Sequence, residues 1–374
     1  MDTPRPTLVL PTREGVSPSC VVLPSQGQGS LLDFLAQRLS AVSRDAWQAR
    51  MQAGEVVDER GEAVTATRPF EPGLRVYYYR SLPSEPHIPF EETVVYRDEH
   101  LLVADKPHFM PVIPTGRYLH HTLLVRLKRR LGLDELSPLH RIDRDTAGLV
   151  MFSVQRATRG LYQGLFRDRQ MTKHYEAVAP WRGDLPFPRE HRSRLEESPQ
   201  FFRMHEVPGE PNSWTQMELL EVGGAWARYR LSPVTGKRHQ LRVHMAALGL
   251  PLRNDPFYPV VNDPPEGDYS RPLQLLARSL AFVDPVTGAQ RVFESRQSLH
   301  LPVGGLFLAV DRFDPLPLIG NGHHCAVAFA IDADPDFRMI GRIADRIAEQ
   351  VEQNLQHAAE FTGRGHQIVL ARRV

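Results

Sequence analysis

The chain has 374 residues, which is enough for two or three domains with a large core. Apolar residues make up 41% and charged residues 24%, and no apolar run approaches the roughly 18 to 20 residues of a membrane span, so disordered and membrane-spanning classes are excluded. The net charge of +1 excludes a uniformly basic surface, and the two distant cysteines, Cys20 and Cys325, exclude a disulfide framework or a cysteine metal cluster.

The N-terminal residues predict an irregular leader followed by two helices. No basic and apolar signal peptide opens the chain, so we expect a protein of the reducing cytoplasm. Residues 1–28 are rich in Pro, Ser and Gly and predict little regular structure. Apolar residues at helical spacing predict a helix over 31–39 with Ser30 as its N-cap. Ser43 opens a second helix, which Gly54 ends.

Short β segments complete a small N-terminal domain, which we place at residues 29–80. They are expected at 55–58, 64–67 and 74–79, the last after a Pro-Gly turn. The next segment, 81–90, contains three prolines and predicts a linker, because proline cannot extend a helix interior or a sheet ladder.

A larger mixed domain is expected from residue 91 onward. Its patterns predict strands at 93–96, 101–105, 148–154 and 172–178, and helices at 123–131 and 157–169. Residues 180–215 are Pro-rich and charged, and they predict a variable surface excursion. A hairpin around two glycines is then expected at 217–222 and 225–231.

The basic charge is concentrated in residues 117–175. This stretch holds 12 Lys and Arg against 5 Asp and Glu, a net charge of +7, which leaves −6 for the remainder. Such clustering is typical of a site for a phosphate backbone. The alternative is a chance run of charges on a solvated face.

A polar turn inside this basic stretch carries the leading catalytic candidate. His140-Arg141-Ile142-Asp143 runs into an apolar β segment, so Asp143 is presented on a loop that a buried strand holds. The stretch resembles the H-R-L-D-x-x-T-S-G-L signature of the RluA-like pseudouridine synthases, with Ile142 for Leu and Ala147 for Ser. A solvated turn with Arg141 and Asp143 as a surface pair is the alternative.

Other segments resemble this family in the same order along the chain. Residues 233–245 are similar to P-x-T-G-R-x-H-Q-L-R-V-H-M, with Lys237 in place of Arg, and this is the most specific match. Four other segments resemble family patterns less closely. Tyr96 to Pro107 resembles Y-x-D-x-x-L-x-V-x-K-P, and Lys173 to Ala177 resembles K-x-Y-x-A. Pro251 to Tyr258 resembles P-I-x-G-D-x-x-Y, and Leu273 to Gly288 resembles L-x-L-H-A-x-x-L-x-F-x-H-P-x-T-G. In the last two, Asn254 replaces a glycine, and Leu276 and Asp284 replace histidines. Asn tolerates the left-handed backbone conformation, so we expect that turn to be kept.

The resemblance implies an α+β pseudouridine synthase fold over residues 91–302, with a mixed, mainly antiparallel sheet, flanking helices and a central cleft. Residues 29–80 then resemble the small alpha-L RNA-binding module that often precedes such synthases. The resemblance ends near residue 302, and the final segment, 303–374, is expected to form a small appendage, with a helix at 336–361 between strands at 325–331 and 367–371.

The resemblance also assigns the catalytic residues. Asp143 corresponds to the catalytic aspartate, Arg242 to the arginine that pairs with it, and Tyr175 to the active-site tyrosine. Isomerising uridine requires an ionised carboxylate, and a nearby guanidinium opposes the tendency of a buried aspartate to stay protonated. The phenol of Tyr175 can stack on the base and take part in removing the C5 proton.

The expected substrate is ribosomal or transfer RNA. The enzyme is expected to be a monomer that needs no cofactor or metal and does not bind a membrane. His239 and His244 lack the i, i+4 spacing of a helical metal pair. Two alternatives stay open: a catalytically silent RNA-binding protein of the same fold, and a carboxylate-dependent hydrolase of small molecules. The residues expected to bind substrate are His140, Arg141, Lys173, Lys237, Arg238 and His239.

Overall fold

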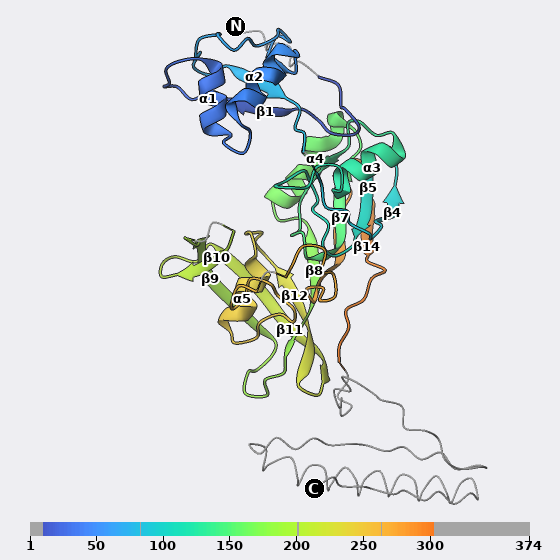
Figure 1. Ribbon diagram of the computed structural model, residues 1–374. Coiled ribbons are helices and arrows are strands. Elements are labelled where there is room, and N and C mark those ends of the chain that lie inside the picture. Colours follow the sequence, from blue (N-terminus) through green and yellow to red (C-terminus); the bar gives the residue numbers. More distant parts are fainter. Residues whose placement is uncertain (1–9, 83, 200–201, 263, 303–374) are drawn as a thin grey trace, which may run out of the picture. The chain divides into compact units, whose positions relative to one another are not determined.

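The computed structural model describes residues 10–302, apart from 83, 200–201 and 263 (Figure 1). The predicted appendage at 303–374 lies outside the described residues. No helix in the described part of the chain is long and apolar enough to cross a membrane.

The first elements form a small domain of helices and a three-stranded sheet. The strands β1 (Ser19–Val22) and β2 (Val56–Asp58) both pair antiparallel with β3 (Arg75–Tyr78). The prediction of an irregular leader is therefore wrong for β1, whose alternating half-buried and exposed residues are too few to give a clear period-2 signal. The predicted strand at 64–67 is also absent, and an isolated bridge between Val57 and Ala63 forms just before this segment.

Both predicted helices of this domain are confirmed with their caps. In α1 (Leu31–Arg38) the Ser30 hydroxyl accepts the N–H of Asp33, and in α2 (Arg44–Gln52) the Ser43 hydroxyl accepts the N–H of Ala46. These caps satisfy backbone donors that the first helical turn leaves without partners. The helices bury an apolar core against the sheet, made of Leu31, Leu32, Leu35, Trp47, Met51, Val56 and Val76.

Residues 91–302 are built on one large sheet. Its strand order is β10-β9-β11-β12-β8-β13-β7-β5-β4, with β14 added to β13 and β6 to β7. Every pairing is antiparallel except that of β13 with β7, so the predicted mixed, mainly antiparallel sheet is confirmed. The strands are β4 (Thr93–Arg97), β5 (Leu101–Lys106), β6 (Ser137–Pro138), β7 (Ala147–Ser153), β8 (Thr172–Pro180), β9 (Arg189–Glu197), β10 (Met204–Val207), β11 (Ser213–Gly223), β12 (Trp226–Pro233), β13 (Leu275–Val283) and β14 (Gln290–Glu294).

Helices flank both halves of this sheet (Figure 1). The predicted helices α3 (Leu123–Leu131) and α4 (Arg156–Arg167) are confirmed and pack with the β7 half, whereas α5 (Gln240–Ala247) packs with β9, β10 and β11. Because α3 and α4 cover opposite faces of β7, that strand is buried along its whole length. This burial gives the loop before β7 a rigid anchor.

The predicted surface excursion at 180–215 is wrong. Residues in this range form β9, β10 and the start of β11, which extend the sheet. The apolar alternation of a half-buried strand is missing because the inward residues are partly polar: Ser193 and Ser213 both bond the buried imidazole of His244. Hydrophobic periodicity cannot reveal a strand whose buried face is held by hydrogen bonds.

One glycine is required where the parallel strands meet. Gly148 in β7 pairs with Ala277 in β13, and its φ of +110° is a conformation that residues with a side chain rarely adopt. A Cβ at this position would lie 2.3 Å from the carbonyl oxygen of Ala277. A side chain would therefore push β13 away from β7, the strand that follows the loop of Asp143.

Replacing Gly148 with alanine is expected to destabilise the fold by about 3 kcal/mol or more, because the added Cβ would clash with backbone atoms of Ala277, which no change of rotamer can move away. Urea unfolding of the full chain measures the change. Gly160→Ala in α4 is the matched control, since nothing lies within 4 Å of a Cβ there and alanine should gain about 0.5 to 1 kcal/mol in a helix. Equal stability of the two variants would contradict the close-approach argument.

Candidate active site

The sheet forks at its centre and opens a cleft. β8 and β12 pair from Pro180 and Trp226 as far as Tyr175 and Leu231, after which β8 continues along β13 alone. The cleft has a volume of about 890 Å³, and side chains from both arms of the fork line it. This volume lies in the range of roughly 300 to 1,000 Å³ that is typical of ligand pockets.

Asp143 enters this cleft from the loop between β6 and β7. Its Oδ2 accepts a hydrogen bond from Nη1 of Arg242 at 3.2 Å, and its Oδ1 is 3.9 Å from Nε2 of His239. The expected pair of Asp143 and Arg242 is therefore present across 99 residues of chain. The side chain of Asp143 is 26% exposed to solvent, whereas that of Arg242 is 1% exposed. The carboxylate thus faces the cleft and the guanidinium lies behind it.

Arg242 is held by a second carboxylate that the sequence interpretation did not assign. Asp255 accepts two hydrogen bonds from the guanidinium, at 2.9 Å from Nε and 2.6 Å from Nη2. Asp255 also accepts the backbone N–H groups of Phe257 and Tyr258. Two nitrogens of Arg242 are thereby committed to Asp255, and Nη1 is directed at Asp143.

The turn that delivers Asp255 keeps its predicted conformation. Asn254 has a φ of 61°, as expected for asparagine in place of glycine. Asp284 and Leu276 stand where the family pattern has histidines. Asp284 is buried and accepts hydrogen bonds from Tyr162 and Arg291, and Leu276 is buried in the core. Both positions are structural in this chain.

The surroundings of Asp143 favour its ionised form. Burial raises the pKa of the carboxyl, but the charges of His239, Arg242 and Lys106, with the hydrogen bond from Arg242, outweigh burial and hold the pKa below its usual value. Burial also lowers the pKa of His239, so Arg242 is the dependable positive partner at neutral pH. Asp143 is therefore a carboxylate at the pH of a cell.

Two more of the predicted site residues, catalytic Tyr175 and substrate-binding His239, lie near Asp143. Tyr175 lines the cleft at the fork, and burial together with the charge of Asp143 raises its pKa well above the usual value. Its phenol therefore keeps its proton at neutral pH and presents a ring and a hydroxyl. His239 takes a left-handed φ of 53° before α5 and bonds the hydroxyl of Tyr258 through Nδ1.

The predicted substrate-binding residues divide into three groups. Arg141, Lys173 and Lys237 line the cleft. His140 lines it too, but its Nε2 accepts the backbone N–H of Met151 and burial lowers its pKa to about 3, so it is a neutral support rather than a phosphate ligand. Arg238 does not line the cleft, because its guanidinium bonds Glu197 and the carbonyl of Arg203.

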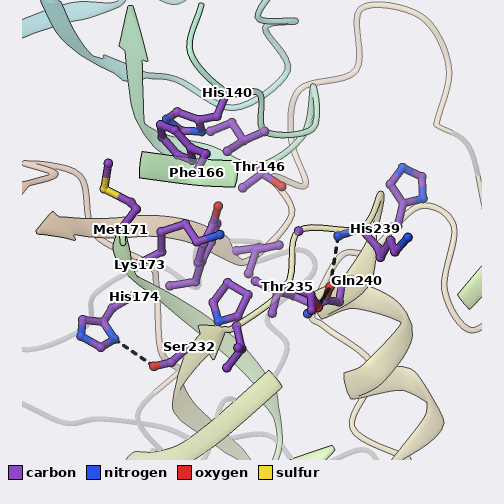
Figure 2. Close-up of a pocket in the computed structure, with 18 of the residues that line it drawn as sticks. His140, Thr146, Phe166, Met171, Lys173, His174, Ser232, Thr235, His239 and Gln240 are labelled. Atoms are coloured by element: carbon purple, nitrogen blue, oxygen red, sulfur yellow. Dashed lines mark hydrogen bonds between the residues drawn. The ribbon is translucent and has the colours of Figure 1, made fainter. Parts of the chain in front are cut away.

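Figure 2 shows the cleft from within. Lys173 and His174 come from β8 and lie opposite Thr235 and Gln240, which precede and open α5. His174 bonds the Ser232 hydroxyl across the fork at 2.9 Å, and Thr235 donates to Gln240 at 2.7 Å. The first contact joins the two arms of the fork beside the cleft, and the second holds the turn before α5.

One cluster among the described residues has the spacing of a metal site. His191, Glu206 and His244 bring their ligand atoms within 4.8 Å of one another. The Ser213 hydroxyl donates to the carbonyl of Ser193, so it accepts from Nε2 of His244, while Nδ1 of that imidazole bonds Thr215. Both nitrogens of His244 are thus used within the protein, and hydrogen bonding accounts for the cluster without an ion.

Comparison with known proteins identifies the family. Residues 100–247 match the family described as RNA pseudouridylate synthase. An uncharacterised RNA pseudouridine synthase of Synechocystis is 32% identical over 234 residues, which cover 61% of this chain and 79% of that protein. The chain belongs to the RluA-like pseudouridine synthase family. As a member, it is an isomerase.

Two further proteins are similar to this synthase. The dual-specificity RNA pseudouridine synthase RluA of Haemophilus influenzae is 31% identical over 226 residues, covering 57% of this chain and 95% of that protein. The structure of human RNA pseudouridylate synthase domain containing 1 is 24% identical, covers 57% of this chain and 86% of that one, and has a TM-score of 0.46. The family match includes Asp143, Tyr175 and Arg242 and ends before Asp255.

Proposed function

We propose that this synthase converts specific uridines to pseudouridine in ribosomal or transfer RNA, with Asp143 as the catalytic carboxylate. The observation that carries the proposal is the carboxyl group of Asp143, which faces the cleft and is bonded by a buried Arg242 that Asp255 orients. These surroundings lower the pKa of Asp143 and favour its ionised form. Tyr175 lies beside it and can pack against a base. A catalytically silent protein would need neither the charge nor its alignment.

The reaction needs no redox step and no external group. The bond between ribose C1′ and N1 of uracil breaks, the base turns within the pocket, and a bond forms from C1′ to C5. C5 then gives up its proton and N1 gains one, so the product has the same atoms as the substrate. Asp143 supplies the ionised carboxylate for this exchange, and Arg242 fixes its direction. We propose that the chain performs this chemistry as a cytoplasmic monomer without a metal ion.

The uridine must leave its stack to reach Asp143. Flipping a nucleotide costs a few kcal/mol, which contacts with the flanking phosphates can offset. We assign those contacts to Arg141, Lys173 and Lys237, which line the cleft. We also propose that residues 29–80, together with β1, form an RNA-binding module ahead of the catalytic domain at 91–302.

The test is a map of pseudouridine in total RNA from cells with and without the gene. We expect one or a few sites to vanish and to return with the wild-type gene but not with Asp143→Ala. The positions that return name the RNA. If no site depends on the gene, the proposal loses its substrate and fails.

Affinity for the identified RNA should fall steeply with salt. Each phosphate contact contributes a slope of about −0.7 to log K against log salt for single strands, so three contacts predict about −2. Single-turnover chemistry at saturating enzyme should not change, because Arg242 and Asp143 are screened little. Binding titrations from 50 to 200 mM KCl measure the slope, and a flat response would contradict a phosphate-dominated interface.

Two neighbouring cations provide a matched comparison for the same titration. Lys237→Met should weaken binding and reduce the slope by roughly one contact. Arg238→Met should change the slope less, because its guanidinium is engaged with Glu197 and the carbonyl of Arg203.

A further inference from the structure

A turn after β5 is tied to the loop that carries Asp143. Lys106, which ends β5 and is fully buried, donates from Nζ to the carbonyl of Arg144 at 3.0 Å. His108, two residues later, bonds the carbonyl of Asp145 through Nδ1 at 2.7 Å. The carbonyl groups of the two residues directly after Asp143 are therefore both held by hydrogen bonds from the end of β5 and the turn that follows it.

The hydrogen bond of His108 determines its tautomer. A carbonyl oxygen only accepts, so Nδ1 of His108 carries the hydrogen. Burial lowers the pKa of His108, and Lys106 nearby acts in the same direction, so the imidazole is neutral at the pH of a cell. The contact is thus made by a neutral donor that is half-buried against the loop. Removing the donor would leave the Asp145 carbonyl without this partner.

The next residue has a conformation that its type rarely adopts. Phe109 has a φ of 65°, which is unusual for a bulky side chain, and only 8% of the residue is exposed. Its ring lies 5.1 Å from that of Tyr269 and 6.0 Å from that of Phe90. A residue stays in such an unfavourable backbone conformation only where its surroundings enforce it, and such residues are common at functional sites.

We propose that His108 is a positioning residue for the isomerisation, which holds the Asp145 carbonyl and thereby sets the place of Asp143, while the anchored ring of Phe109 keeps the turn in its left-handed form. The proposal rests on the catalytic role of Asp143. It adds a reason why that carboxylate stays aligned although its side chain makes a single hydrogen bond of 3.2 Å to Arg242. A displacement of about 1 Å at such a group can cost a hundredfold in rate.

The test compares His108→Leu with His108→Asn on an RNA that carries the mapped uridine. We expect His108→Leu to lower the single-turnover rate by 10- to 100-fold, with the Kd for RNA within twofold of wild type, because no residue of the turn lines the cleft. His108→Asn places an N–H near the position of Nδ1 and should recover most of that rate. A wild-type rate in His108→Leu, or an equal loss in both variants, would overturn the proposal.

A second pair of variants tests the backbone conformation at residue 109. Both variants lose the ring, so they differ only in how easily the residue adopts the left-handed form. Glycine adopts the left-handed form freely, so Phe109→Gly should stay within about threefold of the wild-type rate. Phe109→Ala keeps a Cβ but loses the ring that holds the turn, and it should lose about as much as His108→Leu. An alanine variant as fast as the glycine variant would show that the conformation at residue 109 does not act on the reaction.

The outcomes are distinguishable from failure of the proposed function. Asp143→Ala is the reference in every assay. If it retains turnover, the catalytic assignment fails and the positioning argument fails with it. If it is inactive while His108→Leu reacts at the wild-type rate, only the positioning role is overturned.

Discussion

Asp143→Asn is expected to lose on the order of a thousandfold or more of the turnover rate while still binding RNA. The amide nearly matches the carboxylate in size, but it has no negative charge to offer at the reacting centre. The cations that line the cleft are untouched, so affinity should stay within a few-fold of wild type. Single-turnover assays and binding titrations with the mapped RNA measure the two quantities separately.

Asp145 provides the comparison that tests which carboxylate reacts. It lies two residues from Asp143, but its side chain is buried, bonds Nε of Arg144 and does not line the cleft. Asp145→Asn should therefore retain turnover that Asp143→Asn lacks. The reverse pattern would show that the catalytic carboxylate is Asp145.

Arg242→Met is expected to damage both stability and chemistry. The substitution leaves Asp255 and Asp143 without their shared cation, and breaking a buried pair by removing one partner costs about 3 to 5 kcal/mol. Urea unfolding at pH 7 measures this loss. Arg242→Lys keeps a charge but loses the paired geometry, so it should lie between Met and wild type.

The same variant should change the pH dependence in a fixed direction. In the wild type the pKa of Asp143 lies below its unfolded value, so its ion pair stabilises the fold above the unfolded pKa, and this contribution is lost as the pH falls through the folded pKa. Without Arg242, burial is less opposed and the pKa of Asp143 rises. The acid limb of the single-turnover profile should therefore move to higher pH in Arg242→Met. An unmoved limb would mean that Arg242 does not control the ionisation of Asp143.

The sequence determined the parts of this protein that depend on neighbouring residues. The caps at Ser30 and Ser43, the helices α3 and α4, and the turn at Asn254 follow from local patterns and were predicted correctly. The motifs around Asp143 and Arg242 indicated the family, because each is a contiguous run of residue types. A local signal survives in the sequence because the atoms that interact are only a few residues apart.

Apart from the pair of Asp143 and Arg242, the contacts between side chains at the site were decided only by the tertiary structure. The fork between β8 and β12 creates the cleft, and it brings Lys237 to the cleft while Arg238 turns to Glu197. Strand β9 escaped prediction because hydrogen bonds to His244 hold part of its buried face. The family resemblance implied the pair of Asp143 and Arg242, 99 residues apart, but the second carboxylate on Arg242, that of Asp255, appears only in the folded structure. No local pattern encodes such contacts, because they form only when the folded sheet brings distant strands together.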